Sequence, residues 1–166
     1  MPKLINKNAV IDNPWTVMKA STGPEMLQVV AGKNFIVPLQ FWKLYKEELD
    51  EYDGNIAVWL DSDENPEQIT GGVDSLPLIA LNFPVFSDGR SYTNARELRQ
   101  KHAFKGEVRA IGDVLRDQLY YMSQCGFDTF EIRHDQETEL CLDAFKDFET
   151  GYQSTITQPT PLFRRR

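Results

Sequence analysis

Residues 76–133 read LPLIALNFPVFSDGRSYTNARELRQKHAFKGEVRAIGDVLRDQLYYMSQCGFDTFEIR, and two hydrophobic patterns alternate along this stretch. Short apolar runs are typical of strands, whereas apolar residues spaced three or four apart predict amphipathic helices. The first run, LPLIALNF, is apolar nearly throughout, which indicates a parallel strand covered on both faces. The predicted elements are strands at 76–83, 106–112 and 127–133, separated by helices at 92–103 and 113–124.

The same alternation continues on both sides of this stretch. FIVPL and IAVWL predict two earlier strands, the helical pattern QFWKLYKEELDEYDGN lies between them, and residues 136–150 predict a last helix. Successive parallel strands need right-handed crossovers, so this order predicts neighbouring βα units. The expected fold class is α/β: a single domain of repeated βα units, with a mainly parallel sheet of about four or five strands in a half-barrel or open form.

Three parts are predicted along the chain. Residues 1–33 hold the turn signals IDNPW and STGPE and predict a hairpin-like lead-in. Residues 34–150 form the α/β domain, and residues 151–166 an extended C-terminal tail. The tail ends in two apolar anchors and three cations, which suit docking into an acidic groove of a partner, although a plain solubilising tail stays open. The predicted docking residues are Leu162, Phe163, Arg164, Arg165 and Arg166.

The overall charge limits the classes of partner. The 166 residues carry a formal net charge of −7, so the summed field opposes general binding to nucleic acid or to anionic membranes. The two cysteines lie in segments predicted to be helical, which argues against a disulfide framework and favours a reducing compartment. We therefore expect a cytoplasmic protein that binds neither nucleic acid nor membrane.

Familiar cofactor signatures are missing from the sequence. It contains no G-x-G-x-x-G after a strand, no G-x-x-x-x-G-K-[ST], no C-x-x-C and no H-E-x-x-H. Two cysteines are also too few for an iron–sulfur cluster, which normally takes about four thiolates. The sequence thus predicts no cofactor and no metal site, and it leaves open whether the protein is an enzyme.

Arginines gather in the two loops that follow predicted strands. Arg90 lies in the loop after the strand at 76–83, and Arg116 lies one βα unit later. Ligands of open α/β sheets bind at this edge, and guanidinium groups beside helix amino ends bind oxyanions well. The predicted oxyanion-binding residues are Asp88, Arg90, Tyr92, Arg96, Arg99, Arg109, Asp113 and Arg116.

A structural interpretation of the same arginines stays open beside this one. Carboxylates flank them throughout, so ion pairs could simply tie adjacent βα loops together, with the tyrosines packed between helices. The nearest carboxylates are Asp88, Glu97, Glu107, Asp113 and Asp117.

The motifs FPVFSDGRSYTNARELR and GEVRAIGDVLRDQLYYMSQCGFDTFEI resemble the bacterial family called domain of unknown function 934. The resemblance extends over IVPL, LIALNFP and the closing PLFRRR, and so covers residues 34–166. Members of that family are described as oxidoreductases involved in sulfite reduction, because their genes accompany those for sulfite or nitrite reductase and sulfate assimilation.

The resemblance implies an accessory protein of assimilatory sulfite reduction, within sulfur assimilation. Its expected partners are a sulfite or nitrite reductase subunit and a small oxyanion, that is sulfite, sulfate or phosphate. Two alternatives stay open: a non-catalytic adaptor that docks on the reductase, and a small oxidoreductase with a flavin or nicotinamide site that no familiar motif marks.

Overall fold

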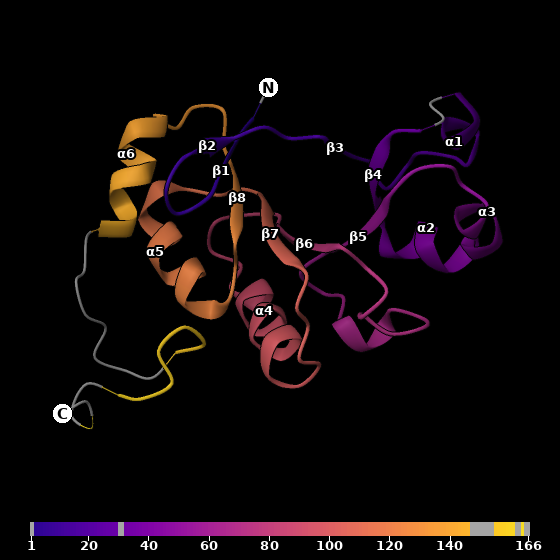
Figure 1. The fold of residues 1–166 in the computed structure, drawn as a ribbon. Coiled ribbons are helices and arrows are strands. Elements are labelled where there is room, and N and C mark those ends of the chain that lie inside the picture. Colours follow the sequence, from indigo (N-terminus) through magenta and orange to yellow (C-terminus); the bar gives the residue numbers. More distant parts are fainter. Residues whose placement is uncertain (1, 30–31, 147–154, 162–163, 165–166) are drawn as a thin grey trace.

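A computed structural model describes residues 2–29, 32–146, 155–161 and 164 of the chain. All strands belong to one eight-stranded sheet in the order β2-β1-β8-β7-β6-β5-β4-β3 (Figure 1). The strands are β1 (Lys3–Ile5), β2 (Val10–Ile11), β3 (Trp15–Val17), β4 (Asn34–Pro38), β5 (Ile56–Leu60), β6 (Leu78–Phe83), β7 (Glu107–Gly112) and β8 (Thr129–Ile132). The helices are α1 (Glu25–Val29), α2 (Leu39–Leu44), α3 (Lys46–Asp50), α4 (Arg90–Gln100), α5 (Arg116–Cys125) and α6 (Thr138–Asp143), with 3₁₀ turns at Pro66–Gln68 and Ala144–Lys146.

Strands β3 to β8 are parallel and stand side by side in chain order, so the sheet curls as a half-barrel. The predicted α/β class is therefore confirmed, and of the two predicted forms, half-barrel or open, the sheet has the half-barrel. The predicted count of about four or five strands and the mainly parallel orientation are wrong, because the sheet has eight strands of mixed orientation. β1 runs antiparallel to both β2 and β8.

The missed strands come from the first seventeen residues, which serve both edges of the sheet. β1 and β2 extend the β8 edge, whereas β3 pairs with β4 at the opposite edge. These strands are only two or three residues long, so their hydrophobic pattern carries little signal.

The link between β2 and β3 shows how tightly the sheet curls. Only residues 12–14 connect the two outermost strands, and four residue steps span at most roughly 14 Å. Eight strands in a flat sheet would be roughly 34 Å wide. The two edges therefore curl towards each other, and the link crosses the concave face as a strap.

The two faces of the sheet carry different residues. Ile79, Leu81 and Phe83 of β6 belong to the main core together with Leu98 of α4 and Leu119 of α5. The alternate strand residues form a second, smaller cluster that no helix residue joins: Ile36, Ala57, Leu78, Ala80 and Ile111, with Trp15, Val17 and Trp59 packed against it. The helices thus cover the convex face, and the second cluster lines the concave face.

Arg109 fills the amino end of the concave face, although it was predicted to bind an oxyanion. Its side chain is 2% exposed and pairs with Glu107 at 2.8 Å. It also donates to Asn13 of the strap at 2.9 Å. Thr129 of β8 donates to the same Glu107 carboxylate. A neutralised polar network therefore occupies this end of the half-barrel.

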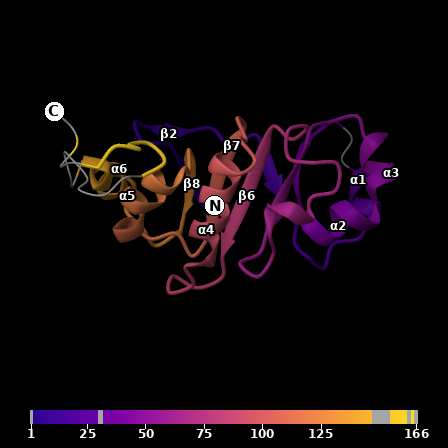
Figure 2. The same cartoon turned by 90° about the horizontal axis from the view of Figure 1, so that it is seen from below.

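The helix ends differ modestly from prediction. α5 begins at Arg116 after Leu115, and Gly126 closes it in the left-handed conformation at φ 111°. The last helix, predicted over 136–150, is α6 followed by a 3₁₀ turn that ends at Lys146, and residues 147–150 lie outside the described residues. Seen from below, α5 and α6 lie at one end of the curved sheet and α1 to α3 at the other (Figure 2).

No helix within the described ranges is both long enough and apolar enough to cross a membrane.

Residues 155–157 of the predicted tail lie against the end of α5. Ile156 donates its amide to the Gln124 carbonyl at 3.1 Å, and the Thr155 and Thr157 hydroxyls donate to the Gln124 side chain at 3.0 Å.

Candidate functional site

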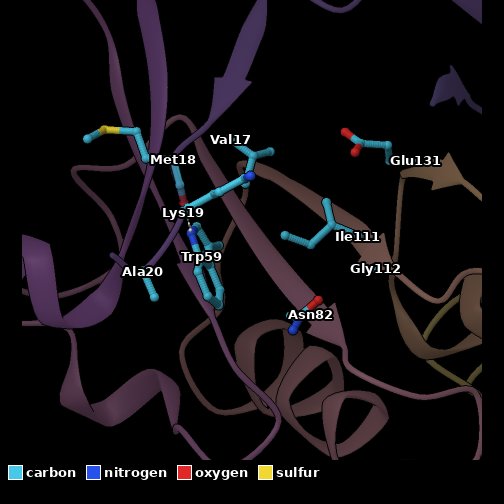
Figure 3. A pocket seen from close by; sticks show the side chains of 9 residues that line it. All are labelled: Val17, Met18, Lys19, Ala20, Trp59, Asn82, Ile111, Gly112 and Glu131. Atoms are coloured by element: carbon cyan, nitrogen blue, oxygen red, sulfur yellow. Dashed lines mark hydrogen bonds between the residues drawn. The ribbon is translucent and has the colours of Figure 1, made fainter. Parts of the chain in front are cut away.

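An open hollow of about 340 Å³ lies at the carboxyl ends of the parallel strands, on the concave face (Figure 3). This is the edge at which (β/α) barrels and open α/β sheets bind their ligands. Five strands contribute to it, because the sheet curls around it. The lining residues are Val17 of β3, Met18, Lys19 and Ala20 just after it, Trp59 of β5, Asn82 of β6, Ile111 and Gly112 of β7, and Glu131 of β8.

The apolar wall is held in place by a hydrogen bond. The Trp59 indole nitrogen donates to the Met18 carbonyl at 2.9 Å, which fixes the ring between β5 and the end of β3. Val17 and Ile111 line the hollow beside it. The indole donor is thus already used, and Trp59 offers a ligand an apolar face.

Asn82 presents an acceptor to the hollow. Its amide nitrogen donates to Asp61 Oδ1 at 3.0 Å. An ionised carboxylate only accepts, so this bond sets the amide orientation and leaves Asn82 Oδ1 on the side of Gly112, as Figure 3 shows. Gly112 has φ +91°, and a Cβ there would lie 2.4 Å from Asn82 Oδ1. Glycine at position 112 therefore keeps this corner open.

Two opposite charges reach the hollow without being paired. Lys19 extends from the β3 side and the Glu131 carboxylate from the β8 side (Figure 3). Neither side chain makes a hydrogen bond or ion pair with another residue in the part of the chain that the structure describes. Burial raises the pKa of Glu131 above its ordinary value, and the nearby Arg109 partly opposes this. Both charges are thus available to a ligand.

Asp88 and Arg90 lie at the same end of the sheet, but behind the hollow. Arg90 donates from Nε and Nη2 to the two Asp88 oxygens at 3.0 and 2.7 Å, and from Nη2 to Ser62 Oγ at 3.0 Å. The hydrogen bonds from Arg90 and Ser62 hold the pKa of Asp88 far below its usual range. Ser62 in turn donates its amide to Asp61, the partner of Asn82. A polar chain therefore runs from Arg90 to the hollow.

Tyr92 and Arg96 lie between α4 and α5. Arg96 Nη2 donates to the Tyr121 hydroxyl at 2.7 Å, and the rings of Tyr92 and Tyr121 are 4.9 Å apart. Burial raises the pKa of Tyr92 to about 12. These contacts join two helices, and neither Tyr92 nor Arg96 lines the hollow.

Arg99 holds a turn at the other end of α4. It donates to the carbonyls of Gly126, Phe104 and Gly106 at 3.0, 2.8 and 2.9 Å, and it pairs with Asp128. Arg109 belongs to the strap network. Arg99 and Arg109 therefore both lie away from the loops that hold Arg90 and Arg116.

Asp113 and Arg116 bind different neighbours at the strand exits. Asp113 accepts the Phe86 amide at 2.8 Å and Arg133 Nη1 at 2.6 Å, so it joins the exits of β6, β7 and β8. Arg116 Nε donates to the Leu140 carbonyl of α6 at 2.9 Å. Arg90 and Arg116 therefore bind neighbours on different elements.

Of the predicted docking residues, only Arg164 falls among the described residues, and it is exposed.

Sequence reasoning missed the residues that line the hollow. Asn82 is the one polar residue of the strand LIALNF and stands near its carboxyl end, and Glu131 interrupts the apolar pattern of TFEI. A polar residue at the carboxyl end of a buried strand is a detectable signal. Lys19 carries no such signal.

Among the described residues, no group of three His, Cys, Asp or Glu side chains is placed to hold a metal ion.

The chain belongs to the family described as a bacterial protein of unknown function, DUF934, whose model matches residues 57–163. No curated protein and no solved structure matches the chain. The matched range runs from the second residue of β5 through β8, and so covers nearly all of four of the strands that form the hollow.

Proposed function

We propose that the protein is an accessory factor of bacterial sulfite reduction that binds a small molecule in the carboxyl-end hollow and works beside a reductase. The observation that carries the binding role is the hollow itself, with an apolar wall and two unpaired charges at the ligand edge of a half-barrel. The link to sulfite reduction is supported by what the sequence resemblance implies, namely the association of family members with genes for sulfite or nitrite reductase; the matched family model itself assigns no function.

The lining side chains supply binding, orientation and proton exchange. Trp59, Val17 and Ile111 offer apolar contact, Lys19 a cation, and Glu131 a carboxylate whose pKa is raised by burial. In this proposal the electrons for sulfite come from the reductase, and this chain delivers or senses a ligand. The partner is therefore a sulfite or nitrite reductase subunit.

A reconstituted assay tests the proposal. Sulfite consumption by the assimilatory reductase of the same bacterium is measured with and without the protein, with Ala20→Phe, and with Ser21→Phe. Ala20 is exposed and lines the hollow, so a phenyl group there fills the mouth, whereas exposed Ser21 is outside the lining. We expect stimulation by the wild type and by Ser21→Phe, and its loss with Ala20→Phe.

The outcomes separate the two halves of the proposal. If the wild type leaves the reductase rate unchanged, the role in sulfite reduction fails. If Ala20→Phe stimulates as well as the wild type, the hollow has no part in that role.

The second candidate is a small oxyanion at the Arg90 loop. Arg90 is 62% exposed and stands in the first turn of α4, although an anion would compete with Asp88 for its guanidinium. Calorimetric titration with sulfite, sulfate and phosphate distinguishes the sites. Loss of binding in Arg90→Ala would place an oxyanion at the loop, loss in Lys19→Ala would place it in the hollow, and no heat from the wild type at millimolar anion would exclude both.

A further inference from the structure

The polar groups that face the hollow are of both signs, which a simple oxyanion does not match. One cation, Lys19, lies on the β3 side, whereas two acceptors, Asn82 Oδ1 and the Glu131 carboxylate, lie towards β6 and β8. An inorganic anion bound at Lys19 would leave both acceptors without donors. The arrangement instead matches a ligand with different groups at its two ends.

We propose that the hollow binds an amphoteric organic molecule, with an acidic group at Lys19, a protonated amine or other N–H donor at Glu131 and Asn82, and an apolar body against Trp59. This inference rests on the proposed function only in taking the hollow as the binding site. It adds the chemical class of the ligand.

The need for a hydrogen-bond donor on the ligand follows from the protein groups near Asn82 and Glu131, because those groups already have partners. Asp61 fixes the Asn82 nitrogen, so only the carbonyl oxygen faces the hollow. Arg109 is the charged group on β7 nearest to Glu131, but Glu107 and Asn13 occupy its guanidinium. Glu131 therefore has a cation nearby but no hydrogen-bond donor within the described residues. A ligand amine supplies that donor.

The size of the hollow limits the ligand. A volume of about 340 Å³ is at the lower end of small-molecule sites, which span roughly 300–1,000 Å³. The Trp59 indole and the Val17 and Ile111 side chains provide a flat apolar surface between the charged ends. An amino-acid-sized molecule with a short apolar or aromatic body suits this space.

The test compares three matched probes by NMR. 4-(Aminomethyl)benzoate carries both charged ends, 4-methylbenzoate only the acid and 4-methylbenzylamine only the amine. The ¹H–¹⁵N signal of the Trp59 indole reports binding, and those of Trp15 and Trp42 report folding. We expect the amphoteric probe to bind at least about tenfold more tightly than either half-probe, since each end adds a charge-assisted hydrogen bond.

Two variants assign the ends. Lys19→Met should lower the affinity for the amphoteric probe to that for 4-methylbenzylamine, and Glu131→Gln should lower it to that for 4-methylbenzoate. Lys33→Met and Glu48→Gln, at exposed positions away from the hollow, are the controls and should bind like the wild type.

The contradicting outcomes are distinct. If 4-methylbenzoate or sulfite binds as tightly as the amphoteric probe, the ligand class is wrong while the hollow remains a binding site. If none of the probes shifts the Trp59 signal, neither the amphoteric class nor binding in the hollow survives, whereas an effect on reductase turnover would still stand.

Discussion

The two ends of the concave face lie on the same strands but differ in how charged side chains are partnered within the described residues: they are paired at the amino end and unpaired at the carboxyl end. At the amino end, Arg109 of β7 is buried against Glu107 and Asn13. Two residues further along the strand, Ile111 lines a hollow where Glu131 has no such partner. A buried charge without a partner is costly, so proteins pair it unless a ligand uses it. The amino end is therefore built for stability and the carboxyl end for binding.

Loss of Arg109 should have the largest effect on stability. Arg109→Met leaves the Glu107 carboxylate without its cation at the amino end of the concave face. Breaking a buried pair costs about 3–5 kcal/mol, and because Glu107 is 30% exposed we expect about 2–4 kcal/mol. Urea unfolding measures the change.

The control for this variant is Lys146→Met, which removes an exposed pair with Asp143 and should cost about 0.3–0.5 kcal/mol. Equal effects of the two variants would show that the strap network does not hold the amino end together.

Gly112 at the carboxyl end should be nearly as sensitive. In Gly112→Ala the new Cβ must adopt φ +91° and lies 2.4 Å from Asn82 Oδ1 and 2.5 Å from the Phe83 carbonyl oxygen. We expect a loss of about 2–3 kcal/mol by chemical unfolding, of which the backbone conformation accounts for about 1 kcal/mol.

Gly71→Ala isolates the backbone contribution, because Gly71 has φ +88° and no atom within 4 Å of its would-be Cβ. It should lose only about 1 kcal/mol. If Gly71→Ala proves as damaging as Gly112→Ala, the close approach to Asn82 has no energetic weight.

Substitution of Glu131 should raise stability at pH 7, whereas the substitutions of Arg109 and Gly112 lower it. Its folded-state pKa is raised above the unfolded value, so the folded protein holds the proton more tightly. The contribution of Glu131 to stability is then fully present below the ordinary Glu pKa of 4.5 and is lost as the pH rises through the raised pKa. Glu131→Gln should therefore unfold at a higher temperature than the wild type at pH 7, with the advantage fading as the pH falls towards 4.

Thermal melts across this pH range measure the difference. A wild type that is more stable than Glu131→Gln at pH 7 would mean that the carboxylate already has a stabilising partner, and the comparison between the two ends would fail.

The smallest effect is expected outside the concave face. Arg90→Ala removes an ion pair with Asp88 in which Arg90 is 62% exposed and Asp88 12%, and solvent screens the pair on the Arg90 side. We expect a smaller drop in melting temperature than for Arg109→Met or Gly112→Ala, and unchanged affinity for 4-(aminomethyl)benzoate. A large loss of that affinity would move the site from the hollow to the arginine loop.

The repeated βα units and the half-barrel could be predicted because long apolar strands such as LIALNF and clear helical spacing carry strong local signals. Residues 3–17 were predicted only as part of a hairpin-like lead-in and not as strands of the sheet, because strands of two or three residues have almost no period and nothing local says which edge they join. Tertiary pairing decides that choice.

The site was harder to predict than the fold. The arginines drew attention because their number is visible in the sequence, yet Arg99 and Arg109 are bound by carbonyl oxygens and a carboxylate that only the fold brings near. Lys19 and Glu131 are 112 positions apart and meet at one hollow only because the sheet curls. Asp88 and Arg90 do lie after β6, where the sequence placed them, but their binding of an oxyanion stays a prediction.

A crystal structure of the protein soaked with 4-(aminomethyl)benzoate tests the central claim most directly. The account predicts density for the probe in the hollow, with its carboxylate at Lys19, its amine at Glu131 and its ring against Trp59. Density at Arg90 with an empty hollow would contradict it. So would a probe bound in the hollow with its carboxylate at Glu131 and its amine at Lys19.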